Sequence, residues 1–176
     1  VSSMKMERIA QFGKGGGGKS TIATNLSYIY AKAGLRVLHV GCDPKRDSTL
    51  RLLGKRAPRS MVDVVFPGDP RQAILRSPDG IDCVETGGPS PGVGCAGRGI
   101  ILTMEHLQRL GLVHEDHYDV ALFDVLGDLV CGGFAAPLIH GFVRKVAVVV
   151  SDEPMSLFAA NNIARMVCLY ASSGVA

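Results

Sequence analysis

The sequence predicts an α/β fold, with a mostly parallel sheet and helices on both of its faces. Short apolar runs alternate with helix-length segments, which is the pattern of βαβ units. A glycine-rich loop stands between the first apolar run and the first helix. Acidic residues follow two of the runs, at the carboxyl ends of strands where parallel sheets gather ligands.

The composition favours one soluble domain over residues 1–176. This length suits a single α/β domain with a sizeable core and is short for two. A net charge of +3 without a basic stripe argues against nucleic acid as a partner. No apolar run approaches the ~20 residues of a membrane helix, and residues 1–7 lack the apolar core of a signal peptide. We therefore expect a cytoplasmic protein without a membrane partner.

Five strands and three helices are expected along the chain. The strand candidates are Arg8–Phe12, Arg36–Val40, Ile81–Glu85, Val120–Phe123 and Lys145–Val150. The first helix begins near Lys19, ends before Gly34, and places on one face, at helical spacing, Ile22, Leu26, Ile29 and Ala33. The other helices are expected over Ile100–Leu110 and Met155–Tyr170. Between Arg46 and Gly80, four prolines interrupt the pattern, so only short helices or strands are expected there.

The glycine-rich loop after the first strand matches the P-loop pattern GxxxxGK[ST], in the strand–loop–helix context that the pattern requires. Its glycines let backbone N–H groups point at phosphate oxygens, and the helix N-terminus adds its dipole. Lys19 is expected on the β- and γ-phosphates and Ser20 on Mg²⁺. The expected nucleotide contacts are Gly13, Lys14, Gly15, Gly16, Gly17, Gly18, Lys19, Ser20, Thr21 and Lys45. A glycine-rich turn that binds nothing is the alternative.

Three carboxylates accompany the loop. Asp43 lies just past the second strand, where it can meet Mg²⁺ or the attacking water. Asp124 closes an apolar run in the Walker-B arrangement, with its carboxylate facing Mg²⁺, and Asp128 follows one short turn later. With Lys14, these are the catalytic candidates. Carboxylates at strand ends are also common as helix caps.

Cysteines are the second group of candidates. The odd count of five in a cytosolic chain argues against a disulfide framework. Cys95 and Cys131 both lie beside glycines, which let backbone N–H groups approach cluster sulfides. A [4Fe–4S] cluster needs four thiolates, so two per chain suffice only if two chains share one cluster on a two-fold axis. From spacing alone, an ordinary buried cysteine remains the competing interpretation.

The chain resembles the nitrogenase iron-protein family and its relatives in tetrapyrrole reduction. The resemblance is carried by Gly13–Thr21, Gly41–Thr49, Cys83–Gly99, Asp124–Pro137 and the run Ala159-Ala160-Asn161-Asn162. It implies that Cys95 and Cys131 are the cluster ligands and that the other three cysteines, Cys42, Cys83 and Cys168, are structural. It also implies that Arg98 lies on the docking face beside the cluster. In some members the matching arginine is inactivated by ADP-ribosylation.

Family membership would also give the phosphate loop a second role. Lys14, directly after the first glycine, matches a variant loop found in a dimeric branch of P-loop ATPases. In that branch this lysine reaches the nucleotide of the partner subunit, and the resemblance implies the same for Lys14. Gly17 departs from the family, which usually has an aliphatic residue there.

The resemblance implies an ATP-dependent electron donor. A homodimer would bind two MgATP, share one [4Fe–4S] cluster, and pass one electron per docking event to a larger catalytic component. That partner would be the nitrogenase molybdenum–iron protein or a nitrogenase-like homologue. The family normally continues well beyond this length, so we expect the C-terminal portion to be missing. The stretch between Thr49 and Ile81 is also a few residues shorter than in the nitrogenase member.

Three alternatives stay open. A positioning ATPase of the same loop branch would act as a binding switch without redox chemistry, and it would not need Cys95 with Cys131. An iron–sulfur assembly carrier would hold its cluster with a close cysteine pair, which these residues lack. Within the family, the final substrate could instead be protochlorophyllide or a methylthio-alkane.

Overall fold

A computed structural model describes residues 6–54, 58–64, 68–89, 94–95, 97–113, 117–127 and 132–172. The strands are β1 (Glu7–Gly13), β2 (Val37–Cys42), β3 (Ile74–Arg76), β4 (Asp82–Glu85), β5 (Val120–Val125) and β6 (Lys145–Val149). The α-helices are α1 (Lys19–Lys32), α2 (Met61–Val64), α3 (Gly97–Arg109), α4 (Ala136–Ile139) and α5 (Pro154–Ser172). Two short 3₁₀ turns, η1 (Pro70–Ala73) and η2 (Gly132–Ala135), complete the described elements.

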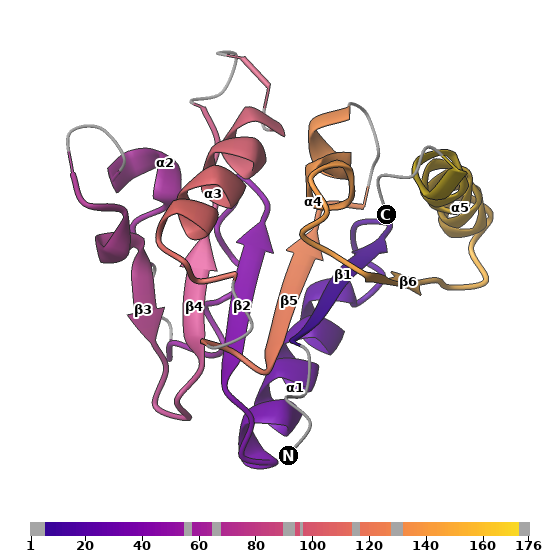
Figure 1. Ribbon diagram of the computed structural model, residues 1–176. Helices are drawn as coiled ribbons and strands as arrows, with labels where there is room; N and C mark the ends of the chain where they lie inside the picture. Colours follow the sequence, from indigo (N-terminus) through magenta and orange to yellow (C-terminus); the bar gives the residue numbers. More distant parts are fainter. Residues whose placement is uncertain are drawn as a thin grey trace.

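The strands form a single sheet in the order β3-β4-β2-β5-β1-β6 (Figure 1). All neighbouring pairs are parallel except β3 with β4, which is antiparallel and lies at one edge. The predicted α/β fold with a mostly parallel sheet is therefore confirmed. The sheet order places the carboxyl ends of β2, β5 and β1 side by side.

The helices cover the sheet on opposite faces because side chains alternate along each strand. On β2, Leu38, Val40 and Cys42 belong to the core cluster that includes the buried face of α3. Val37, on the opposite face, packs with residues of α1 and the loop after it. α5 contributes Ile163 to the larger cluster and packs against β1 and β6.

The five predicted strands and three long helices are confirmed, with ends that differ by a few residues. The helical face predicted for α1 is not the face that packs on the sheet. Ile22 and Ile29 are 43% and 58% exposed, whereas Ala23 and Ser27 of the same helix are fully buried. Small side chains let α1 approach the sheet closely, so its apolar stripe points outward.

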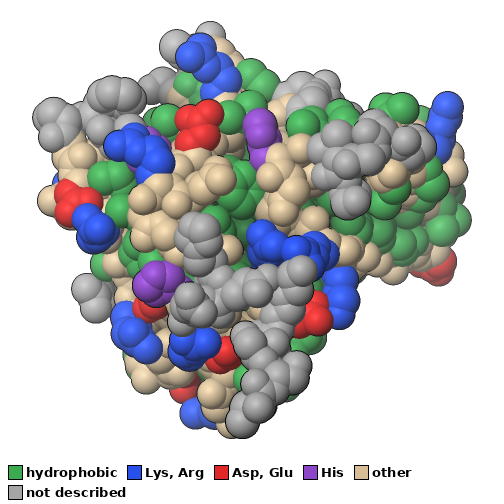
Figure 2. All heavy atoms as spheres, viewed as in Figure 1, with side chains coloured by type: hydrophobic (Ala, Val, Ile, Leu, Met, Phe, Trp, Pro, Cys, Tyr) green, Lys and Arg blue, Asp and Glu red, His purple; other side chains and the backbone are tan. Residues whose placement is uncertain are grey.

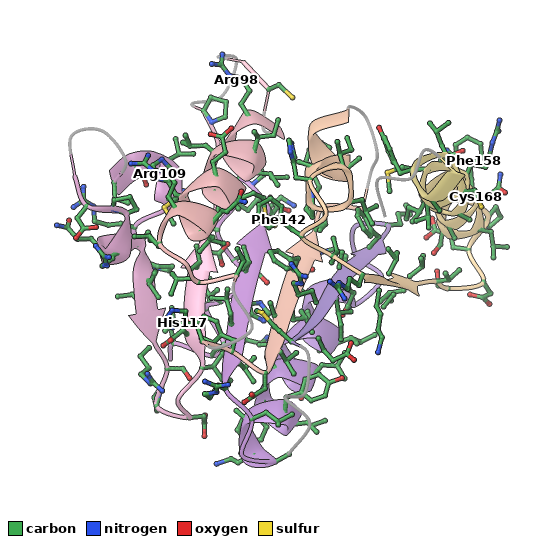
Figure 3. The ribbon with its side chains drawn as sticks, in the orientation of Figure 1. Arg98, Arg109, His117, Phe142, Phe158 and Cys168 are labelled. Carbon is green, nitrogen blue, oxygen red and sulfur yellow. The ribbon has the colours of Figure 1, made fainter. Side chains whose placement is uncertain are left out.

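Apolar side chains also lie on the surface of the C-terminal elements. Figure 2 shows hydrophobic side chains gathered over α5. The exposed ones on β6, on α5 and between them are Val148, Val150, Met155, Leu157, Phe158 and Leu169. Figure 3 labels Phe158 and Cys168 on this helix. None of the helices in the described ranges has the length and hydropathy needed to span a bilayer.

Candidate functional site

The candidate site lies where three adjacent strands end. In the sheet register, Asp124 of β5 stands opposite Gln11 of β1 and Gly41 of β2. The chain leaves β1 into the phosphate loop and leaves β2 into the segment that holds Asp43. The fold therefore brings together the loop and two of the three predicted carboxylates at the carboxyl edge of the sheet, as expected for a parallel sheet.

The phosphate loop has the backbone that a bound anion requires. Gly16 and Gly18 both have φ of +84°, a left-handed conformation that glycine adopts without strain. A Cβ added at Gly15, Gly16 or Gly18 would meet nothing within 4 Å, so there is space beside the loop. Helix α1 begins at Lys19 directly after the loop, which aims its N-terminal N–H groups and dipole at the same space. These residues fit a nucleotide phosphate chain.

Lys19 and Asp124 form a buried ion pair at the base of this loop. Their side chains are only 8% and 2% exposed, and the ammonium contacts Oδ1 of the carboxylate. Oδ2 accepts a 2.6 Å hydrogen bond from the Ser48 hydroxyl. Ser20 lies next to the lysine, with 3.4 Å between its Oγ and Nζ of Lys19. The lysine, the hydroxyl and the carboxylate expected at phosphate and Mg²⁺ therefore adjoin one another.

The segment after β2 is fixed at both of its ends. At the start, Oδ1 of Asp43 accepts a 2.9 Å hydrogen bond from the backbone N–H of Lys45. At the end, Thr49 donates from its N–H and its hydroxyl to Oε1 of Glu85, at 2.7 and 2.8 Å. Glu85 is fully buried on β4, and burial raises the pKa of its carboxyl to about 7. Asp43 is half-buried and Lys45 is exposed.

Gly127 brings the chain after β5 against the phosphate loop. A Cβ added at Gly127 would fall 1.3 Å from the carbonyl oxygen of Gly13 and 2.8 Å from the backbone nitrogen of Lys14. No side chain fits there without moving one of the two segments. A displacement of the phosphate loop would therefore displace Gly127 as well.

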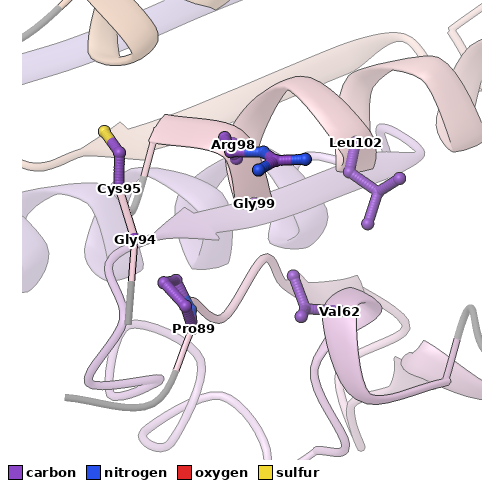
Figure 4. A pocket seen from close by; sticks show the side chains of 7 residues that line it. All are labelled: Val62, Pro89, Gly94, Cys95, Arg98, Gly99 and Leu102. Carbon is purple, nitrogen blue, oxygen red and sulfur yellow. The ribbon is translucent and has the colours of Figure 1, made fainter. Parts of the chain in front are cut away.

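Cys95 and Arg98 lie together at the N-terminal end of α3. Cys95 is exposed, and its carbonyl accepts a 3.1 Å hydrogen bond from the backbone N–H of Arg98. Both residues line a pocket of about 410 Å³, shown from close by in Figure 4. Its other lining residues are Val62, Pro89, Gly94, Gly99 and Leu102. Figure 3 shows the Arg98 side chain at the outer end of this helix.

The chain that follows the second predicted cluster ligand packs against this same helix end. Gly133, two residues after Cys131, lies so close to α3 that an added Cβ would be 2.4 Å from the Cα of Gly97. Gly97 in turn follows Cys95 by two residues. Cys131 and Asp128 themselves lie outside the described residues. No group of three or more His, Cys, Asp or Glu side chains poised for a metal occurs in the part of the chain that is described.

Comparison with known proteins identifies the family. The model described as "4Fe-4S iron sulfur cluster binding proteins, NifH/frxC family" matches residues 7–176. The chain belongs to this family. "Nitrogenase iron protein 2" of Methanothermobacter thermautotrophicus is 53% identical over 163 residues, covering 91% of this chain and 60% of that protein. "Nitrogenase iron protein" of Methanospirillum hungatei is 47% identical over 176 residues, covering 92% of this chain and 59% of that protein. The chain thus spans about 60% of the length of these relatives.

Solved structures support the fold. The MinD cell division protein of Aquifex aeolicus superposes with a TM-score of 0.67 at 24% identity, covering 93% of this chain and 64% of that one. A cobyrinic acid a,c-diamide synthase of Mycobacterium smegmatis, solved with bound ADP and magnesium, superposes with a TM-score of 0.68 at 22% identity. The match covers 93% of this chain and 67% of that one. At these identities the likeness concerns the fold alone.

The residues present fit the cluster that the NifH/frxC family is described as binding. The exposed Cys95 stands beside glycine backbone, and the Gly97–Gly133 contact joins the two segments that carry the predicted ligands. Cys42 and Cys83 are buried, and burial raises the pKa of both thiols, that of Cys83 to about 12. They are thiols rather than thiolates at neutral pH, which suits the structural role expected of them. Cys168 is exposed on α5, so it is not a buried core residue.

Lys14 has a defined partner in this chain. Its ammonium forms an ion pair with Glu153, just before α5, and both side chains are partly exposed. The role across a dimer that was predicted for Lys14 remains a prediction.

Three residues of the site were not singled out from the sequence. His39 is a lone polar residue in the buried strand β2, a pattern that carries no local signal of function. Glu85 is the carboxylate that ends β4, and this position at a strand end is the same signal that marked Asp124. Gly127 had a readable signal, because a glycine three residues after the Walker-B carboxylate marks a close backbone approach.

Proposed function

We propose that the protein is an ATP-dependent electron donor of the nitrogenase iron-protein type. Two copies would share one [4Fe–4S] cluster through Cys95 and Cys131 and would deliver single electrons to a nitrogenase or nitrogenase-like catalytic component. The cluster, when bound, supplies the one-electron chemistry. Names of the relatives, family membership and the geometry of the phosphate loop support this proposal.

The observation that carries the proposal is the path of one short segment. It begins at Asp124, which pairs with Lys19 of the phosphate loop. It touches the loop again at Gly127, and at Gly133 it packs on the helix end that follows Cys95. Residues that contact the phosphate loop and a residue that contacts the helix end after Cys95 therefore belong to one stretch of ten residues, 124–133, of which residues 128–131 lie outside the described ranges.

Each candidate side chain of the site has a separate role in this proposal. Lys19 would bind phosphate oxygens, and Ser20 and Asp124 would hold Mg²⁺. Asp43 would orient the attacking water, and loss of the γ-phosphate would release the loop contact at Gly127, as in other nucleotide switches. Arg98, exposed beside Cys95, lies on the surface that meets the catalytic component, where charge governs encounter and orientation.

Iron content tests the proposal. Protein purified and reconstituted without oxygen should contain about four iron atoms per two chains and migrate as a dimer. Cys95→Ser should lose the iron, whereas Cys168→Ser, an exposed cysteine on α5, should keep it. A wild-type protein that stays free of iron after reconstitution would instead favour a positioning ATPase, which shares the fold.

A further inference from the structure

A histidine stands in the middle of the most buried part of the sheet. His39 occupies the centre of β2, opposite Cys83 of β4 and Leu122 of β5, and it is fully buried. It lies on the face covered by α1, where Ser27 is also fully buried. A buried imidazole needs partners for both ring nitrogens.

Both nitrogens have such partners, and they lead to the nucleotide site. Nδ1 lies 2.8 Å from the Ser27 hydroxyl of α1. Nε2 lies 2.8 Å from the hydroxyl of Ser48, which is 2.6 Å from Oδ2 of Asp124. A continuous buried chain of hydrogen bonds thus runs from α1 through β2 to the carboxylate that also contacts Lys19.

The donor in each of these three hydrogen bonds can be assigned by starting from Asp124, where the series ends. A carboxylate paired with an ammonium only accepts hydrogen bonds, so Ser48 donates its single proton to Asp124. The Ser48 oxygen must then accept from an Nε2–H of His39. Nδ1 is left with its lone pair and accepts from the Ser27 hydroxyl. Only one neutral tautomer of His39 satisfies all of these contacts.

The electrostatics agree with a neutral ring. Burial lowers the pKa of His39 to about 4, although the Asp124 carboxylate raises it and the Lys19 ammonium lowers it further. At neutral pH the ring therefore carries no charge and has one proton to place. The neighbouring Thr49 is held on Glu85 of β4, so the loop after β2 has two adjacent buried anchors.

We propose that His39 is a positioning residue for nucleotide hydrolysis: through its Nε2–H it fixes the Ser48 hydroxyl, which in turn sets the orientation of the Asp124 carboxylate toward Lys19 and Mg²⁺. This inference rests on the ATP-hydrolysing function proposed above. It assigns α1 a second role, since the Ser27 hydroxyl donates to Nδ1 and so satisfies the tautomer of the ring that Ser48 requires.

Phosphate release from MgATP by the purified protein tests the proposal. His39→Leu should lower kcat by about tenfold, because one oriented hydrogen bond to the reacting site is lost. Ser48→Ala should lower kcat by a similar factor. Because His39 acts through Ser48, the double variant should be no slower than Ser48→Ala alone. Losses that multiply in the double variant, or an unchanged kcat in His39→Leu, would overturn the proposal.

A conservative variant separates orientation from packing. In His39→Gln, the side-chain amide can donate toward Ser48 in place of Nε2–H, so kcat should return to within about threefold of the wild type. If kcat of His39→Gln is as low as that of His39→Leu, the hydrogen bond donated to Ser48 does not set kcat, and the proposal is wrong. The Gln variant also keeps the test open if the Leu variant does not fold.

The tautomer can be measured without nucleotide. Ring ¹⁵N spectra at neutral pH should show one histidine that is neutral with its proton on Nε2, absent in His39→Gln and shifted in Ser48→Ala. His117→Gln, which removes an exposed histidine, should leave that signal unchanged. A proton on Nδ1 or a charged ring would contradict the assignment. Failure of the wild type to bind MgATP would sink the proposed function while leaving this spectroscopic result readable.

Discussion

Lys19 and Asp124 carry the charge balance of the nucleotide site. Each is almost fully removed from water, and each neutralises the other. Removing one partner of a buried pair typically costs about 3–5 kcal/mol because the other charge stays buried and unpaired. We therefore expect Lys19 to serve both in binding phosphate and in keeping Asp124 in place.

Replacing this lysine should abolish nucleotide binding. Lys19→Ala is expected to weaken MgATP affinity by at least about 100-fold, since it removes the buried ammonium at the base of the phosphate loop. Equilibrium dialysis or calorimetry would measure the MgATP affinity. Lys32→Ala, at the far end of the same helix and exposed, is the matched control and should bind normally. Normal affinity in Lys19→Ala would refute the assignment of the site.

Glu85 should give the fold a measurable dependence on pH. Its pKa is raised by burial from an ordinary value of 4.5 to about 7. Between those values the folded protein keeps a proton that the unfolded chain has released, so stability falls as pH rises through this window. The slope is at most about 1.4 kcal/mol per pH unit, and it ends above the folded pKa, where both states have released the proton.

Urea unfolding at several pH values should isolate this effect. Glu85→Gln keeps an acceptor for Thr49 but cannot titrate, so the stability difference between the wild type and this variant should change between about pH 4.5 and 7. His39, whose pKa is lowered to about 4, contributes a slope of opposite sign that both proteins share. Glu105→Gln, an exposed control, should follow the wild type. Parallel curves for wild type and Glu85→Gln would contradict the burial argument.

At the scale of elements, the strands were predictable and the short pieces were not. Five of the strands coincide with apolar runs that can be read in the sequence. The short elements α2, η1 and β3 have no periodic pattern in the sequence, and their contacts include residues distant in sequence, as in the Arg46–Asp63 ion pair at 2.5 Å. In α1 the pattern predicted the helix correctly, but close packing on the sheet selected the small side chains Ala23 and Ser27 for the buried face.

The same contrast holds for the candidate site. The phosphate loop and the Walker-B carboxylate have local motifs, so their places were predictable. Glu85 and His39 act through partners that are distant in sequence, Thr49 and Ser27. Neither the lone His39 in β2 nor the carboxylate that ends β4 indicates its partner in the sequence, so only the three-dimensional arrangement could show these partners.

Gly127 joins two elements, and its role can be tested alone. Gly127→Ala should displace either the phosphate loop or the chain after β5, because the new Cβ would overlap the Gly13 carbonyl. We expect Tm to fall by about 5 °C or more and nucleotide affinity to weaken. Gly15→Ala, in the same loop but with open space at its Cβ, should leave Tm nearly unchanged. Equal Tm values for the two variants would show that the contact at Gly127 does not constrain the loop.

For the whole molecule, we infer that nucleotide and cluster would be linked through the segment that follows Asp124. That segment touches the phosphate loop at Gly127 and the Cys95 helix end at Gly133. A change at one end should therefore alter the environment of the other. The reduction potential of an iron–sulfur cluster responds to exposure and to hydrogen bonds at its sulfurs, so it reports such a change.

The most direct measurement is an anaerobic redox titration of the iron-loaded protein with and without MgATP. We predict a reduction potential that shifts when MgATP is added to the wild type and stays constant in Lys19→Ala, which retains Cys95 and Cys131 but lacks the lysine expected on the phosphates. Identical potentials in the wild type with and without MgATP, under conditions where calorimetry shows the nucleotide bound, would contradict it.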